Sequence, residues 1–280
     1  MSSFAKRFIL TITAIPLLFC LIYFLPHHYH LGFAILTVLA TLVGSYEMRQ
    51  MIFIEGESPI VHAWVAVIFP ILQYVELAYC PRIPLTLLAF AIILLYGLSK
   101  EVFVGSKTDF AMTIDRISRS ALLFFYPGIL STFIIRLLFF KEATLLLLMI
   151  FLLVFGNDTF AYIFGMLFGR RSRNILAVSP NKSIVGYVGG LVVTLAISLL
   201  WTQLMEPLKA IFTPPQALLM GFIVSISGNL GDLIESVFKR GARVKDSGTI
   251  ILGRGGILDS IDSLLASVPF FYFYLLYLTQ

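Results

Sequence analysis

The sequence predicts an all-α protein that crosses the membrane about nine times, with its N-terminus in the cytoplasm. Its 280 residues are 59% hydrophobic and only 12% charged, with a mean hydropathy of +0.96, whereas a soluble domain carries about a quarter charged residues. Apolar runs long enough to cross the hydrocarbon core recur along the chain, and the basic residues gather between alternate runs. Helices that face lipid can be apolar on every side.

A membrane-spanning helix needs about 20 apolar residues. We expect spans at 8–25, 31–54, 62–80, 83–99, 118–138, 143–168, 184–205, 211–231 and 257–278. The first run follows Lys6 and Arg7, as in a signal peptide. No small-residue cleavage site precedes Pro26, so we expect this run to be retained.

The distribution of positive charge predicts the topology. With a cytoplasmic N-terminus, all but four of the 20 Lys and Arg residues lie on the cytoplasmic side. The four on the other side are Arg82, Arg136, Lys141 and Lys209. This imbalance follows the positive-inside rule and places the C-terminus outside.

Composition also excludes several classes of function. Cys20 and Cys80 show no metal-ligand or disulfide spacing, and the histidines at 27–30 fit an interfacial loop better than a metal site. The net charge of +5 comes without a basic stripe interleaved with aromatic residues, so we expect no nucleic-acid partner.

The chain divides into two regions by its polar content. Residues 1–145 form N-terminal spans without a recognised motif, and Glu47, Arg49, Glu55 and Glu57 are expected on a solvated loop there. Residues 146–280 carry carboxylates inside apolar runs. Such groups cost several kcal/mol in the membrane unless they are paired or functional, so we expect the active site in this second region.

The first polar cluster continues an apolar run without a helix breaker. Asp232, Glu235, Ser236 and Lys239 are spaced i, i+3, i+4 and i+7, which places them on one helical face. A glycine-rich basic loop follows and leads into Ile257-Leu258-Asp259-Ser260-Ile261-Asp262. Carboxylates from two helix ends, joined by a basic loop, suit Mg²⁺ and the phosphates of a nucleotide. A buried salt-bridge cluster is the structural alternative.

The second cluster lies upstream. Asp158, Tyr162, Gly165 and Gly169 share a helical face, and the glycines also fit close helix packing. The turn Ser179-Pro180-Asn181-Lys182-Ser183 follows. No P-loop spacing is present, so a nucleotide would not be held in the Walker manner.

These motifs resemble the phosphatidate cytidylyltransferase (CDP-diacylglycerol synthase) family over residues 155–265. The family signature Ser-x-x-Lys-Arg, Lys-Asp-x-Gly, His-Gly-Gly-x-x-Asp-Arg-x-Asp is matched by Ser236, Lys239-Arg240, Lys245-Asp246-Ser247-Gly248 and Arg254-Gly255-Gly256-Ile257-Leu258-Asp259-Ser260-Ile261-Asp262. The upstream pattern is matched by Asp158, Ala161-Tyr162, Gly165 and Ser179-Pro180-Asn181-Lys182-Ser183-Ile184-Val185-Gly186. Arg254, Ser260 and Val185 depart from it, since the family usually has His, Arg and Glu there.

The resemblance implies transfer of a cytidylyl group from CTP to phosphatidic acid, with release of pyrophosphate. It implies Mg²⁺ as cofactor, with a monovalent cation left open, and Asp232 and Asp259 as metal ligands. Asp262 is a further ligand or orienting group, and Lys239 completes the catalytic set. The residues implied to contact substrate are Asp158, Tyr162, Lys182, Ser183, Ser236, Arg240, Lys245, Asp246 and Arg254.

The resemblance also sets the expected surroundings. Phosphatidic acid and other membrane lipids would be partners at a site that faces the cytoplasm, in a bacterial inner membrane, and a homodimer is left open. Two alternatives remain. One is a related CTP-dependent kinase or cytidylyltransferase of isoprenoid lipids. The other is a secondary transporter that relays ions through its carboxylates.

Overall fold

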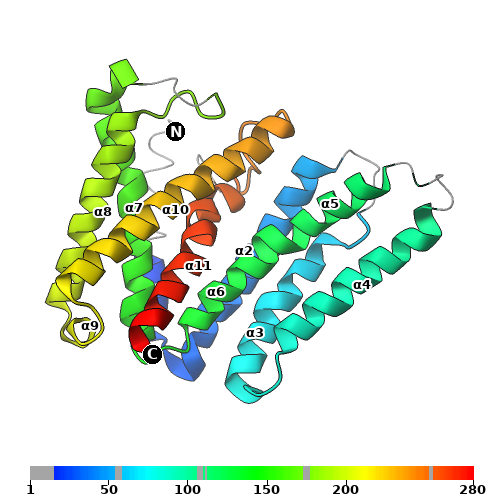
Figure 1. Ribbon diagram of the computed structural model, residues 1–280, viewed down its shortest axis with the longest axis horizontal. Coiled ribbons are helices and arrows are strands. Elements are labelled where there is room, and N and C mark those ends of the chain that lie inside the picture. Colours follow the sequence, from blue (N-terminus) through cyan, green and yellow to red (C-terminus); the bar gives the residue numbers. More distant parts are fainter. Residues whose placement is uncertain (1–15, 54–58, 106–109, 111, 173–176, 252–254) are drawn as a thin grey trace.

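The computed structural model describes residues 16–53, 59–105, 110, 112–172, 177–251 and 255–280. These residues form helices joined by short turns, and Ile251 and Gly255 form an isolated antiparallel bridge. The elements in order are α2 (His27–Ile52), η1 (Ala63–Val67), α3 (Ile68–Tyr79), α4 (Leu85–Gly105), α5 (Thr113–Phe124), η2 (Phe125–Ile129), α6 (Leu130–Leu137), α7 (Ala143–Phe168), η3 (Gly169–Ser172), α8 (Ile184–Leu204), α9 (Glu206–Lys209), α10 (Pro214–Gly241) and α11 (Leu258–Thr279) (Figure 1).

The predicted all-α membrane fold is confirmed. Within the described residues, seven helices are long and apolar enough to cross a membrane, and they match predicted spans. These are His27–Ile52, Leu85–Val104, Thr113–Leu137, Ala143–Phe168, Ile184–Leu204, Pro214–Gly241 and Leu258–Thr279. The predicted span 62–80 is a shorter apolar helix, Ala63–Tyr79. The predicted span 8–25 lies mostly outside the described residues, although 16–24 is helical.

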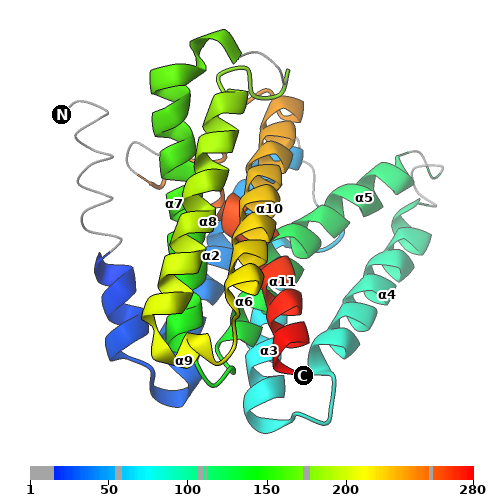
Figure 2. The ribbon, with the colours of Figure 1, turned by 60° about the vertical axis from the view of Figure 1, so that its left-hand side comes forward.

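Helices α7, α8, α10 and α11 pack against one another as the main bundle (Figures 1 and 2). Small residues allow this close packing. A Cβ on Gly190 of α8 would lie 2.9 Å from the carbonyl oxygen of Asn157 on α7. A Cβ on Gly231 of α10 would lie 2.6 Å from the Cβ of Ala266 on α11. Glycine at these positions lets neighbouring backbones come together, as in other packed membrane helices.

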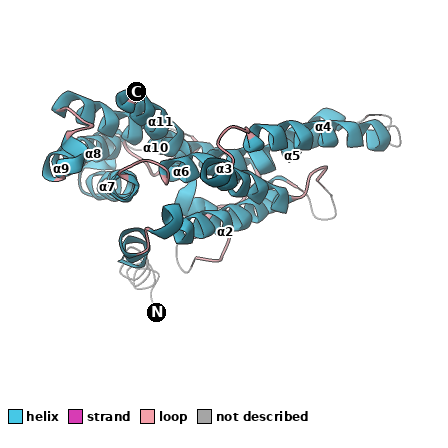
Figure 3. Cartoon of the chain, turned by 90° about the horizontal axis from the view of Figure 1, so that it is seen from below, coloured by secondary structure: helices cyan, strands magenta, loops and turns pink. Residues whose placement is uncertain are grey.

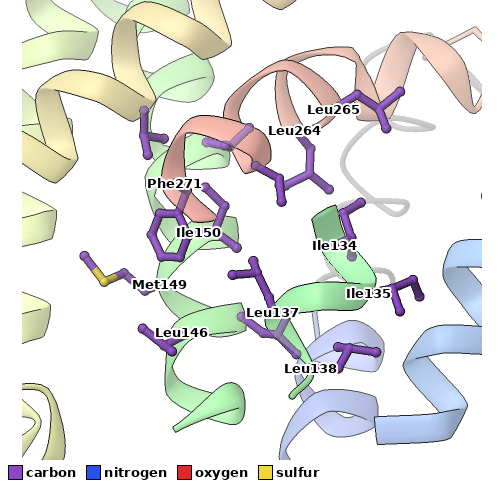
Figure 4. Packing of buried hydrophobic residues seen from close by; sticks show 14 of the residues in the cluster. Ile134, Ile135, Leu137, Leu138, Leu146, Met149, Ile150, Leu264, Leu265 and Phe271 are labelled. Carbon is purple, nitrogen blue, oxygen red and sulfur yellow. The ribbon is translucent and has the colours of Figure 1, made fainter. Parts of the chain in front are cut away.

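A continuous apolar core joins this bundle to the rest of the chain. In Figure 4, residues of α6 and the turn after it meet residues of α7 and α11. The labelled members are Ile134, Ile135, Leu137, Leu138, Leu146, Met149, Ile150, Leu264, Leu265 and Phe271. Phe33 and Met48 of α2 belong to the same buried cluster. The core therefore includes both sequence regions.

Helix α4 is the least buried of the seven long apolar helices in the described part of the chain. Only 17% of its apolar window is buried, against 44% for α2, α7, α10 and α11. It contacts α3 and α5 and projects from the body with α5 (Figure 3). This exposure suits a helix that faces lipid.

The polar ends of several helices gather at one end of the molecule. Figure 1 shows the ends of α2, α7 and α10 on the same side as the starts of α8 and α11. The two polar clusters of the sequence are thereby brought together.

Candidate active site

A polar cavity of about 650 Å³ lies between the ends of α7, α8, α10 and α11. It brings together most of the predicted site residues. Those that line it are Asp158, Tyr162, Lys182, Ser183, Asp232, Lys239, Asp246, Asp259 and Asp262. A second hollow, of about 20 Å³, lies between α4 and α5 against residues 60–61. Its size corresponds to about one water molecule.

The turn before α8 forms one wall of the cavity. Ser183 is the N-cap of α8, and its Oγ accepts a hydrogen bond from the backbone N–H of Gly186 at 3.1 Å. Serine favours this position because its side chain satisfies a free N–H of the first turn. The cap holds Lys182 at the cavity, where its ammonium pairs with the carboxylate of Asp232 on α10.

The opposite wall is formed by α10 and α11. Lys239 pairs with Glu235 one turn earlier on α10, and its Nζ lies 2.6 Å from Oδ1 of Asp259 on α11. The side chain of Glu235 is fully buried, and that of Asp259 is 7% exposed. Buried carboxylates need such a partner because an uncompensated charge is very unfavourable in a low dielectric.

The loop before α11 fixes the carboxylate of Asp259. Its Oδ2 accepts hydrogen bonds from the backbone N–H of Ser247 at 2.8 Å, from Oγ of Ser247 at 2.9 Å and from the N–H of Gly256 at 2.8 Å. Gly255 has a φ of +108°, and a Cβ there would overlap Oδ2 of Asp259. Glycine avoids both the strain and the clash. Oδ2 is therefore anchored, while Oδ1 meets Lys239.

Asp262 completes the carboxylates of the cavity. It is 6% exposed, lies one turn after Asp259 and accepts a hydrogen bond from the N–H of Ser263 at 2.6 Å. In the described part of the chain, no group of three or more His, Cys, Asp and Glu side chains is close enough to hold a metal ion by itself. A divalent cation at these carboxylates would take its remaining ligands from water and from substrate, which is how Mg²⁺ is commonly bound.

A polar network lies beneath the cavity. Asn157 of α7 donates from Nδ2 to Oδ1 of Asn229 at 3.0 Å, and its Oδ1 accepts from Oγ of Ser225 at 2.7 Å. Thr194 of α8 lies 3.4 Å from the same oxygen. These bonds join three helices. They fix the positions of two residues that line the cavity, Asn229 and Asp158, which follows Asn157 in α7.

Several predicted site residues lie elsewhere. Ser236 is buried and does not line the cavity. Arg240 and Lys245 are exposed outside it, and Nε of Arg240 donates to the carbonyl oxygen of Val178 at 3.3 Å. Arg254 lies outside the described residues.

The structure adds residues to the cavity that the sequence interpretation missed. Asn229 precedes Asp232 by three positions on α10, so the helical spacing was a usable signal. Tyr187 and Asn181 line the wall next to Lys182. Tyr187 is an aromatic residue in an apolar helix and gave no such signal.

The prediction for Glu47 was wrong. Expected on a solvated loop, it is 3% exposed inside α2 and accepts hydrogen bonds from Ile257 and Leu258. These partners are 210 and 211 residues away along the chain, so no local pattern reveals them. Glu55 and Glu57 lie outside the described residues.

Comparison with known proteins decides the family. A sequence model of the cytidylyltransferase family matches residues 5–278. The chain belongs to the cytidylyltransferase family. The match includes the N-terminal helices as well as the residues that line the cavity, so the similarity to the family extends over almost the whole sequence.

Individual relatives agree with this assignment. The chain is 43% identical over 123 residues to a phosphatidate cytidylyltransferase of Staphylococcus saprophyticus, covering 44% of this chain and 46% of the relative. It is 40% identical over 123 residues to the phosphatidate cytidylyltransferase of Bacillus subtilis, covering 44% of each. An uncharacterised Escherichia coli protein, YnbB, is 35% identical over 188 residues, or 63% of this chain and 58% of the relative. The chain thus matches about half the length of these relatives.

Proposed function

We propose that this protein transfers a cytidylyl group from CTP to phosphatidic acid, giving CDP-diacylglycerol and pyrophosphate. The observation that carries the proposal is the cavity itself, at one end of a membrane-spanning bundle, where one lysine–aspartate pair joins two facing walls and a second lies on the α10–α11 wall. Lysines can bind phosphate oxygens, and the carboxylates suit a divalent cation. Two relatives of this chain are phosphatidate cytidylyltransferases, which supports the choice of substrates.

The size of the cavity supports a nucleotide-sized ligand. Its volume of about 650 Å³ falls within the ~300–1,000 Å³ of small-molecule sites. Tyr162 lies 68% exposed on the α7 side, next to Asp158 on the same helical face. We assign these two residues to the nucleoside end or the cavity wall, away from the lysines that would meet the phosphates.

We further propose that Mg²⁺ binds to Asp232 and Asp259, with Asp262 as a further ligand or orienting group. The donor set fits, because carboxylates from α10 and α11 line one cavity and Asp259 has one oxygen anchored by the loop. Bound there, Mg²⁺ would offset the charge of the triphosphate and polarise its oxygens.

The side chains of the chain would then act by position and charge. An oxygen of the lipid phosphate forms a bond to the α-phosphorus of CTP, while the bond from that phosphorus to the bridging oxygen breaks and pyrophosphate leaves. No protein nucleophile is needed. Lys182 and Lys239 line the cavity. They would pair with phosphate oxygens and stabilise the charge that develops on the leaving group.

We place the site at the cytoplasmic face of a bacterial inner membrane, in a chain of about nine spans with a cytoplasmic N-terminus. The positive-inside distribution of the sequence supports this orientation. Phosphatidic acid would then reach the cavity by diffusion within the inner leaflet.

The test is pyrophosphate release by purified protein in detergent with labelled CTP, phosphatidic acid and Mg²⁺. Asp232→Asn should lower the rate roughly 10³-fold, as loss of a charged group at the reacting phosphates would, while the protein remains folded. Asp115→Asn is the matched control, because Asp115 pairs with Arg119 on α5 away from the cavity. Its activity should stay within about twofold of wild type.

Substrate choice decides between the alternatives. Release of pyrophosphate that depends on phosphatidic acid supports the proposal. Turnover of CTP only with a polyprenol lipid would replace phosphatidic acid by an isoprenoid substrate. An active Asp232→Asn variant would contradict the assignment of the metal site.

A further inference from the structure

Glu47 is a buried carboxylate in a region of the chain without a recognised motif. It lies on α2 near the end of that helix and is 3% exposed. Among the residues that the structure describes, it forms no salt bridge. A carboxylate buried in a membrane-spanning helix is unfavourable by several kcal/mol unless other groups compensate it, so its partners indicate why it is there.

Those partners belong to the start of α11. Oε1 of Glu47 accepts a hydrogen bond from the backbone N–H of Ile257 at 3.0 Å, and Oε2 accepts one from the N–H of Leu258 at 2.8 Å. Ile257 is the N-cap residue of α11 and Leu258 its first residue. The first N–H groups of a helix have no intrahelical acceptor and carry partial positive charge. Glu47 therefore satisfies these donors from outside the helix.

The loop before α11 fits closely around the Glu47 side chain. A Cβ on Gly248 would lie 2.9 Å from Cδ of Glu47, and a Cβ on Gly256 would lie 2.6 Å from the same carbon. Any side chain at these positions would push the carboxylate out of its place. The lack of a side chain at Gly248 and Gly256 therefore leaves the space that the Glu47 carboxylate occupies.

Ser247 links Glu47 to the cavity. Its Oγ lies 3.3 Å from Oε2 of Glu47 and 2.9 Å from Oδ2 of Asp259, and it accepts a hydrogen bond from the N–H of Asp259 at 3.2 Å. Glu47 and Asp259 thus both contact Ser247 and the residues at the start of α11. Asp259 faces the cavity, whereas Glu47 does not line it.

We propose that Glu47 is a positioning residue for the active site. By holding the N-terminus of α11 and, through Ser247, the anchored oxygen of Asp259, it fixes the direction in which Asp259 presents its other oxygen to the cavity. This inference rests on the proposed function for its effect on the rate. Its effect on the loop stands on the contacts alone. Through Glu47, the N-terminal region would support the active site although it does not contact the substrate.

The first readout is hydrogen–deuterium exchange of the purified protein. In Glu47→Gln, which keeps the size of the side chain but loses the charge, amides 257 and 258 should exchange about tenfold faster or more, as expected for loss of hydrogen bonds to a charged acceptor. Amides 247 and 256, which donate to Asp259, should also exchange faster, but by less, because the segment that holds them is loosened. Exchange in α7 and α8 should not change. Glu101→Gln is the matched control, because Glu101 is also a buried glutamate and pairs with Arg116 on α5. It should leave the exchange of amides 247 and 256–258 unchanged from wild type.

The second readout separates positioning from mere stability. Glu47→Gln should raise the Mg²⁺ concentration that gives half-maximal thermal stabilisation, and should lower kcat by roughly 10- to 100-fold, as loss of an outer-sphere partner does. Glu47→Asp, which keeps the charge, should recover part of both. Ser247→Ala, which leaves the α11 N–H bonds of Glu47 in place, should move both quantities in the same direction by less. If Glu47→Gln does not fold, the Ser247→Ala variant still tests whether this contact affects the Mg²⁺ midpoint and kcat.

The outcomes are distinct. Faster loop exchange together with a raised Mg²⁺ midpoint supports the proposal. Unchanged exchange, or faster exchange with an unaltered Mg²⁺ midpoint and kcat, overturns it. If the wild-type protein does not turn over CTP and phosphatidic acid, the proposed function fails, while exchange and the Mg²⁺ midpoint still decide the role of Glu47.

Discussion

The two walls of the cavity hold their lysines in different ways. Lys182 of the α8 wall pairs across the cavity with Asp232 of α10, and the two side chains are 25% and 31% exposed. On the α10–α11 wall, the side chains of Lys239, Glu235 and Asp259 are 13%, 0% and 7% exposed. Both lysines line the cavity, but Lys239 and its partners are more deeply buried than Lys182 and Asp232.

The surroundings increase this difference. Asp259 accepts three further hydrogen bonds from Ser247 and Gly256. Lys182, by contrast, lies in a short turn outside any helix. An exposed ion pair contributes little to stability, whereas breaking a buried one leaves a charge that is very unfavourable. We infer that the α10–α11 wall is a fixed frame and that Lys182 can exchange its partner for an incoming phosphate.

The largest effect is expected for Lys239→Met. It leaves Glu235 and Asp259 buried without their cation, so the variant should lose about 3–5 kcal/mol of folding stability as well as activity. Chemical unfolding in mixed micelles measures the first quantity and pyrophosphate release the second. The double variant Lys239→Met/Glu235→Gln should regain stability but not activity. Recovery of both would mean that Lys239 serves the fold alone.

A smaller and more selective effect is expected for Lys182→Met. Because the pair with Asp232 is partly exposed, folding stability should change by less than about 1 kcal/mol. The kcat/KM for CTP should fall roughly 10²-fold, since a cation at the phosphates would be lost. Lys182→Arg should retain part of the activity, because it keeps the charge but changes the donor geometry. If Lys182→Met loses as much folding stability as Lys239→Met, the inference that only the α10–α11 wall is a fixed frame is wrong.

Much of this arrangement could be predicted from the sequence because it depends on local spacing. Helical periodicity places Asp232 and Lys239 on one face of α10 and Asp259 and Asp262 on one face of α11, and all four line the cavity. The cost of carboxylates in lipid gave a physical reason to expect them to be paired or functional.

What could not be predicted depends on contacts between distant segments. The partners of Glu47 lie 200 residues or more further along the chain. No spacing shows that α2 ends beside α11. Arg240 and Lys245 suggested phosphate binding because of their charge, yet neither lines the cavity, and Arg240 donates a hydrogen bond to the carbonyl oxygen of Val178 instead. Charge alone does not give the direction of a side chain at a helix end.

The smallest effect is expected for Lys245→Ala. Lys245 is exposed outside both walls, so it should act only through the field near an anionic membrane surface, worth about 1 kcal/mol per basic residue. The kcat/KM for phosphatidic acid in liposomes should fall about fivefold at low ionic strength and return to wild type at high salt, because added ions screen exposed charges. Lys209→Ala is the matched control, since Lys209 is an exposed lysine at the other end of the bundle, paired with Glu206. Its activity should stay unchanged at both salt concentrations. A salt-independent loss of more than about tenfold in Lys245→Ala, larger than a surface field can produce, would mean that Lys245 contacts the substrate directly.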